Sequence, residues 1–202
     1  MLPRGQTLAG PREAVVRAFF PDSGLIASIT EMPPGRTVAV AAIGAEGFVG
    51  VSRILALPRQ PRRIVTLLQS AGHHVPVDAL RRAFEEIEGF RAAVLAHMGR
   101  QLIEISSLVA CSRVHSHRQR LGRWILTMTD KVQEQSLLVT HDVLAQLVGG
   151  PRSAVTVALN EFTAKGAITH RRGKVNILNR SVLVAQACEC YLQQRDLINS
   201  TN

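Results

Sequence analysis

The first third of the chain alternates short apolar runs with clusters of turn-forming residues. The apolar runs span residues 14–20, 25–30, 37–43, 64–68 and 75–77. Turn formers separate them, as in Pro21-Asp22-Ser23-Gly24 and Pro33-Pro34-Gly35-Arg36. Short runs bounded in this way are typical of strands in an antiparallel sandwich or barrel. Residues 1–78 are therefore expected to form a β domain.

From residue 78 onward the pattern becomes that of helices. No proline occurs between Pro76 and Pro151, and Asp78 is expected to cap a helix that begins at the next residue. One narrow apolar stripe recurs at steps of three or four and comprises Val94, Met98, Leu102, Ile105 and Val109. Such a stripe predicts a seam with the same helix of a second copy, although it could instead pack on its own β domain. Residues 79–114 are expected to form a dimerisation helix and hinge.

Residues 140–159 have the pattern of two helices joined by a tight turn. Thr140 can cap the first helix, Gly149 permits a left-handed backbone, and Pro151 suits the start of the second helix. In a helix-turn-helix the second helix enters the major groove of DNA and its N-terminal side chains contact base edges. The candidate base-reading residues are Arg152, Ser153 and Thr156. The alternative is an ordinary pair of helices without a DNA function.

A basic hairpin follows the second helix and favours the DNA-binding reading. Residues 167–177 contain two short strand patterns around a basic tip, as in a β-wing. The residues expected to contact DNA phosphates are Thr140, His170, Arg171, Arg172 and Lys174. Residues 115–202 are therefore expected to form a winged helix-turn-helix domain, and the whole chain to be an α+β protein.

The charge of the chain agrees with double-stranded DNA as the partner. The formal net charge is +9, and residues 113–180 alone hold 11 basic and 4 acidic residues. A basic excess concentrated on one module supplies affinity for a polyanion that does not depend on sequence. A solvated basic surface without a nucleic-acid role is the alternative.

The order of β domain, long helix and winged helix-turn-helix resembles the Crp/Fnr family of transcription regulators. The resemblance is carried by residues 44–50 (Gly-Ala-Glu-Gly-Phe-Val-Gly), residues 144–159 and residues 187–191 (Ala-Cys-Glu-Cys-Tyr). It implies an antiparallel β roll, a jelly roll like those that bind cyclic nucleotides. It also implies a homodimer that reads a palindromic operator. RNA polymerase is a further partner that the resemblance suggests, and Gly50 and Arg62 would lie at the effector pocket.

The sequence departs from the family at the positions that bind cyclic AMP. Val51 stands where those members have a Glu for the ribose, and Arg63 stands where a Ser follows the phosphate-binding Arg. Cyclic-AMP binding is therefore not expected, because these hydrogen bonds would be lost. Any effector is an unidentified small molecule. The family's first helix and opening strands are not expected before Gly5, so either Met1 is not the natural start or the roll is incomplete and exposes a sheet edge. Ser153 and Val157 stand where many members have a Glu and an Arg that help to read their operators.

The cysteines and histidines are not expected to form a metal or redox site, and no cofactor is expected. Cys188 and Cys190 lie two positions apart on an expected helix, so their thiols should point away from each other. Cys111 could face its symmetry mate in a dimer. His73 and His74 are expected in a solvated turn, and His115 and His117 in a solvated joint between domains.

Other function classes are weakly supported by the sequence. No phosphate-binding loop, nucleophile elbow or paired carboxylate cluster occurs, so an enzyme is not expected. No run of 18 apolar residues and no secretory signal occurs, so the cytoplasm is the expected location. The rival interpretation is a truncated interaction protein that pairs with another regulator without reading DNA itself.

Overall fold

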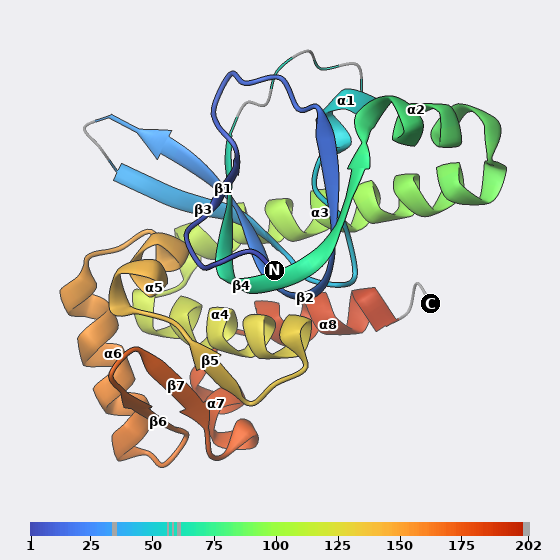
Figure 1. The fold of residues 1–202 in the computed structure, drawn as a ribbon. Coiled ribbons are helices and arrows are strands. Elements are labelled where there is room, and N and C mark those ends of the chain that lie inside the picture. The colour runs from blue at the N-terminus through green and yellow to red at the C-terminus, as the bar shows by residue number, and fades with distance from the viewer. Residues whose placement is uncertain (34–35, 56, 58, 60–61, 200–202) are drawn as a thin grey trace. The chain divides into compact units, whose positions relative to one another are not determined.

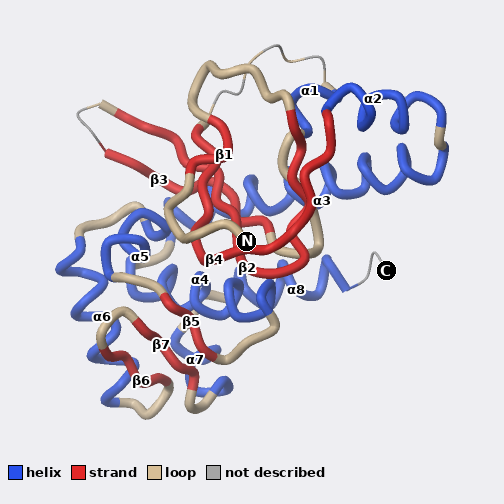
Figure 2. Tube along the Cα trace, in the orientation of Figure 1, coloured by secondary structure: helices blue, strands red, loops and turns tan. Residues whose placement is uncertain are grey.

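The computed structural model describes residues 1–33, 36–55, 57, 59 and 62–199 (Figure 1). Its contacts divide the chain into two compact units. The first unit contains Met1–Arg36 and Val40–Ile103, and the second contains Thr37–Ala39 and Glu104–Asn202. Strands dominate the first part of the chain and helices the remainder, as Figure 2 shows. The predicted α+β fold with an N-terminal antiparallel β roll is confirmed.

The β roll is built on one sheet with the strand order β1-β4-β2-β3. These strands are β1 (Thr7–Ala9), β2 (Arg17–Met32), β3 (Arg36–Ile43) and β4 (Arg63–Pro76). Strands β2 and β4 pair antiparallel along most of their length. Their inward side chains form an apolar core that includes Phe19, Ile26 and Ile64.

Two expected turns in this sheet are wrong. Residues 21–24 lie inside β2, where the pairing register with β4 shifts at three places. These irregularities, and the left-handed backbone of Gly24 (φ +83°), absorb the turn-forming residues as bulges in one long strand. His73 and His74 also lie in a strand, β4, rather than in a turn. Both are exposed, and His73 lies 3.1 Å from Asp22 while His74 packs against the ring of Phe19.

The helical part begins with α1 (Val51–Ile54), α2 (Val77–Glu86) and α3 (Glu88–Val114). The expected helix from residue 79 is thus two helices, which separate at the extended residue Ile87. Asp78 is not the cap, because α2 begins at Val77 and Pro76 takes the cap position. The Asp78 carboxylate instead lies in the first turn, where the helix dipole favours a negative charge.

In its described residues the second unit contains five further helices and a small sheet. The helices are α4 (His117–Val132), α5 (His141–Val148), α6 (Arg152–Ala164), α7 (Arg180–Gln186) and α8 (Cys190–Asn199). Strands β5 (Ser136–Leu138), β6 (Ile168–Arg171) and β7 (Lys174–Ile177) form a sheet in the order β5-β7-β6. Helix α4 contains the buried Trp124, and a capping box between Ser116 and Gln119 fixes its start. Strand β5 was not anticipated.

Helices α4, α5 and α6 share an apolar interior. Fully buried members include Leu121, Ile125, Leu144, Leu159 and Phe162.

Among the described residues no helix combines the length and the apolar character needed to cross a membrane.

Candidate DNA interface

The helix-turn-helix forms where the sequence predicts it. Thr140 occupies the cap position of α5, and its hydroxyl oxygen accepts a hydrogen bond from the backbone N–H of Val143 at 3.4 Å. Gly149 ends α5 in the left-handed conformation (φ +66°), and α6 begins directly after Pro151. These local preferences set the turn between the two helices, which brings α5 and α6 into contact.

The start of α6 presents polar side chains to solvent. Arg152, Ser153 and Asn160 are exposed, and Val157 on the same side of the helix is 58% exposed. Thr156 is half-buried, and its hydroxyl lies 3.1 Å from the carbonyl oxygen of Arg152. Bases could therefore be contacted by a cation, two hydroxyls and an apolar side chain that suits a thymine methyl group.

Arg152 is only loosely held in the free protein. Its Nε lies 3.6 Å from the carboxylate of Asp142, and both side chains are 67% exposed. An ion pair this exposed contributes little to stability. The guanidinium can therefore exchange its carboxylate partner for a DNA group at low cost.

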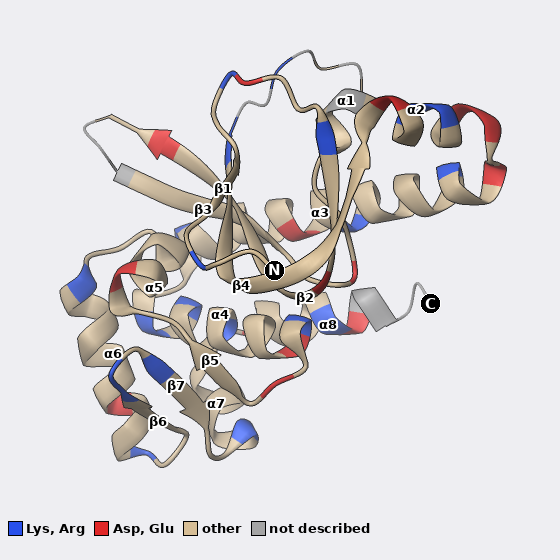
Figure 3. Ribbon diagram, viewed as in Figure 1, with Lys and Arg blue, Asp and Glu red and all other residues tan. Residues whose placement is uncertain are grey.

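The basic wing is a two-residue hairpin between β6 and β7. Its turn residues Arg172 and Gly173 both have positive φ, at 47° and 75°, as the tightest hairpin turns require. Arg171, Arg172 and Lys174 are exposed, and Figure 3 shows basic residues on this hairpin and at the start of α6. A Cβ atom placed on Gly173 would lie 3.8 Å from Cγ2 of Thr140, so the wing tip lies beside the start of α5.

Two histidines connect the helix-turn-helix to the wing. The rings of His141 and His170 lie 5.8 Å apart, and Nδ1 of His170 lies 3.0 Å from the hydroxyl of Thr163 on α6. Burial lowers the pKa of His141, and the positive charges of His170 and Arg152 lower it further. Both neighbours that disfavour a proton on His141 are residues predicted to contact DNA.

Comparisons with known proteins agree with this geometry. Residues 119–185 match the model of the Crp-like helix-turn-helix domain. The CRP-like cAMP-activated global transcriptional regulator of Mycobacterium tuberculosis is 24% identical over 192 residues, which cover 92% of this chain and 83% of that protein. The chain therefore contains a Crp-like helix-turn-helix domain, and its predicted resemblance to the Crp/Fnr regulators is confirmed.

Solved structures of Crp/Fnr regulators share the fold. A CRP-family transcriptional regulator of Thermus thermophilus superposes with a TM-score of 0.79 at 17% identity, covering 94% of this chain and 98% of that structure. The c-di-GMP responsive global regulator CLP of Xanthomonas campestris gives a TM-score of 0.72 at 17% identity, covering 87% and 90%. The effectors named for the Mycobacterium and Xanthomonas proteins differ, so similarity to them assigns no effector to this chain.

The predicted dimer stripe of the chain has two parts on α3. Val94 is buried, and it and Met98 pack in the core that includes Phe48 and Leu80 of the first unit. Ile105 is half-buried, whereas Leu102 and Val109 are 67% and 60% exposed. The first part of the stripe therefore packs on its own β domain, which was the alternative interpretation. An exposed apolar face remains on the later turns.

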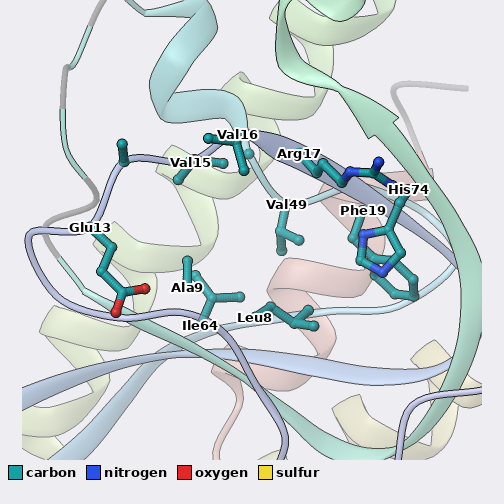
Figure 4. A pocket seen from close by; sticks show the side chains of 12 residues that line it. Leu8, Ala9, Glu13, Val15, Val16, Arg17, Phe19, Val49, Ile64 and His74 are labelled. Carbon is teal, nitrogen blue, oxygen red and sulfur yellow. The ribbon is translucent and has the colours of Figure 1, made fainter.

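The β roll contains a partly open cavity of about 270 Å³ (Figure 4). Its lining is mostly apolar and includes Leu8, Val15, Phe19, Val49 and Ile64. Of the two residues predicted at an effector pocket, Gly50 lines this cavity and Arg62 is not among the lining residues. The charged groups at the cavity are those of Glu13 and Arg17, with the ring of His74 beside Arg17 in Figure 4.

The cysteines contradict two expectations. Helix α7 ends at Gln186 and α8 begins at Cys190, so Cys188 lies in the link between them and not on a shared helix. Because the link changes the chain direction, the Cys188 and Cys190 side chains turn into one cluster with Cys111 and His115. The Cys111 and Cys188 sulfurs lie 3.5 Å apart, so Cys111 faces Cys188 of its own chain.

The electrostatics of this cluster favour a thiolate. A hydrogen bond from Cys188 lowers the pKa of Cys111 to about 4 against the opposing effect of burial, and the nearby Arg123 lowers it further. The same contact raises the pKa of Cys188. Burial alone would lower the pKa of His115, but its contacts with Cys111 and Glu189 raise it overall. The spacing of residues along the sequence did not predict this cluster, because Cys111 and Cys188 are 77 residues apart.

Proposed function

We propose that this regulator binds duplex DNA as a homodimer and reads a palindromic operator with Arg152, Ser153 and Thr156. The observation that carries the proposal is the exposed polar start of α6 beside the basic hairpin of β6 and β7. A helix of this kind fits the major groove, and a bidentate Arg contact with guanine contributes about 1–3 kcal/mol of discrimination. The wing residues Arg171, Arg172 and Lys174 would hold the domain on the phosphates.

The phosphate contacts proposed for Thr140 and His170 have different roles. The Thr140 hydroxyl already accepts a backbone hydrogen bond at the start of α5. Its contribution to DNA binding would be to fix this helix start, whose free N–H groups can bind a phosphate. His170 is half-buried against Thr163, so it would contact the backbone through the ring nitrogen that faces away from that residue.

The homodimer is supported by the exposed apolar face of α3. Leu95, Leu102 and Val109 are each more than half exposed and recur every seven residues, which is the spacing of a two-helix seam. The seam would therefore keep Leu102 and Val109 of the predicted stripe and replace the buried Val94 with Leu95. In the dimer, two copies of α6 would read half-sites one helical turn apart.

Regulation by cyclic AMP is not part of the proposal. The cavity of the β roll has an apolar lining, and Val51 and Arg63 replace the ribose-binding and phosphate-binding residues of cyclic-AMP-dependent members. An unidentified, mostly apolar small molecule would suit this cavity better. RNA polymerase is a further proposed partner, at a surface that we do not assign.

Selection from random duplexes tests the proposal. The purified chain is mixed with the duplex pool at two salt concentrations, and the retained DNA is sequenced. We expect an enriched palindrome, and Arg152→Ala should relax the preference at one position in each half-site. Arg81→Ala is the matched control, because Arg81 is an exposed arginine of the first unit that pairs with Glu85 on α2.

Two other outcomes would contradict the proposal. Retention that depends on salt but enriches no sequence would indicate a basic protein that coats DNA. The absence of any retention would favour the interaction protein that pairs with another regulator. Sedimentation of the same sample gives the oligomeric state independently of DNA.

A further inference from the structure

Four side chains of types that bind metals converge in the second unit, and none of them is a residue proposed to contact DNA. Cys111 lies in the last turn of α3, His115 follows this helix, and Cys188 and Cys190 lie just before and at the start of α8. Their ligand atoms all lie within 4.8 Å of one another. The three cysteines are buried, and the His115 side chain is 10% exposed.

The distances between these atoms suit a tetrahedral ion better than a disulfide. Zn²⁺ binds sulfur at about 2.3 Å and imidazole nitrogen at about 2.0–2.1 Å, so the edges of its tetrahedron measure about 3.8 Å and about 3.6 Å. The Cys111 and Cys188 sulfurs are 3.5 Å apart, and the Cys190 sulfur is 3.7 Å from Nδ1 of His115. A disulfide would need its sulfurs at about 2.0 Å.

Glu189 holds His115 in the orientation that a metal ligand requires. Its carboxylate lies 3.1 Å from Nε2 of His115, while Nδ1 faces Cys190. A proton on Nε2 would donate to Glu189 and leave the lone pair of Nδ1 for an ion. Metal-binding histidines are commonly fixed by a carboxylate in this way.

A buried arginine lies beside the cluster, and a negative charge nearby would stabilise it. Arg123 on α4 is 2% exposed, and its Nη2 donates to the side-chain oxygens of Gln194 and Ser107. Its Nη1 has no hydrogen-bond partner among the described residues. Three thiolates around a divalent ion carry one net negative charge, which this guanidinium would balance.

The geometry points to a structural Zn²⁺ site formed by Cys111, Nδ1 of His115, Cys188 and Cys190. Soft thiolate donors select zinc over hard cations, and four protein ligands leave no open position for catalysis. The ion would tie the end of α3 to the start of α8. This inference goes beyond the proposed function and does not depend on DNA binding.

Metal analysis of the untagged protein tests the site. After dialysis against metal-free buffer, we expect about one zinc per chain, and Cys188→Ser and His115→Asn should each lose it. His73→Asn is the matched control, because His73 is an exposed histidine of the first unit and should leave the zinc content unchanged. Zinc retained in full by both ligand variants would overturn the inference.

A variant outside the ligand set keeps the inference testable if the ligand variants fail to fold. The Glu189 side chain is 65% exposed, so Glu189→Gln should fold normally yet bind zinc roughly 10- to 100-fold more weakly. Competition with a chelating dye measures this change. Replacement of zinc by Co²⁺ should give the visible spectrum of a tetrahedral thiolate complex.

Three results would reject a zinc site whatever the protein does with DNA. One is a metal-free chain with three reactive thiols that takes up no Zn²⁺. Another is iron with acid-labile sulfide, which would indicate a cluster. The third is a disulfide between Cys111 and Cys188, found by mass spectrometry of protein alkylated without reduction.

Discussion

The hydroxyl of Thr156 on α6 lies 3.0 Å from Nδ1 of His141, the first residue of α5. The same hydroxyl lies 3.1 Å from the carbonyl oxygen of Arg152 one turn earlier. A residue at the expected DNA-reading surface therefore also joins the two helices of the helix-turn-helix. Its hydroxyl and methyl groups can be examined separately.

Removal of the Thr156 hydroxyl should weaken the domain. Thr156→Val keeps the shape of the side chain but loses both contacts, and we expect a loss of about 1 kcal/mol in the free energy of unfolding. Thr156→Ser retains the hydroxyl and should stay closer to the wild type in stability, while it loses the methyl group available to thymine. Urea denaturation of both variants measures the difference. Equal stability of Thr156→Val and the wild type would show that the hydroxyl contacts contribute nothing.

The stability of the helix-turn-helix should depend on pH through His141. Burial and the charges of His170 and Arg152 lower its pKa from the ordinary value of 6.5. The unfolded chain therefore binds a proton that the folded domain resists. The stability that the domain gains from a neutral His141 is fully present above pH 6.5. It is lost as the pH falls through 6.5 towards the lower pKa that His141 has in the folded domain.

His141→Gln should flatten this part of the pH profile, because it removes the titrating group and keeps a polar side chain near Thr156. Urea midpoints measured from about pH 7.5 to about pH 5.5 test the expectation. His73→Gln in the first unit should retain the wild-type slope. If His141→Gln kept the full slope as well, the dependence would have to come from another group.

The wing can lose charge without losing its turn. Arg172 has φ 47°, a conformation that Asn adopts more readily than most residues, so Arg172→Asn should preserve the hairpin. Loss of one phosphate contact from each wing of the proposed dimer should reduce the slope of log affinity against log salt concentration by about 1.8, or about 0.9 per contact. Titrations of a labelled duplex at several salt concentrations measure this slope.

Gly173→Val is the structural counterpart of this variant. Its β-branched side chain is strained at φ 75°, so it should distort the wing and weaken DNA binding although the charge is unchanged. If Arg172→Asn left the slope of log affinity against log salt concentration unchanged, Arg172 would not contact a DNA phosphate.

A charge on the exposed face of α3 should break the dimer. Leu102→Glu places carboxylates opposite each other in a seam of two helices, so we expect a monomer in light scattering and weaker binding to a two-half-site duplex. Leu178→Glu is the control, because Leu178 is 63% exposed and lies outside α3. A Leu102→Glu protein that stays dimeric would place the interface elsewhere.

The sequence predicted the winged helix-turn-helix well because its signals are local. The cap at Thr140, the left-handed Gly149 and the helix start after Pro151 each act within one turn of chain. The wing likewise follows from a two-residue turn between basic residues. In the β roll, the same reliance on local signals misled at residues 21–24, because pairing with β4 continues β2 through a turn-forming stretch.

The sequence by itself determined the order of β domain, long helical segment and winged helix-turn-helix, and the positions of α6 and the basic wing, since propensity, capping and charge act between near neighbours. Only the tertiary structure decided which half of the α3 stripe is buried and which groups gather around Cys111. The link between α7 and α8 brings Cys188 to within 3.5 Å of a residue 77 positions earlier. Such contacts depend on how helices pack and turn in space, which spacing along the chain does not encode.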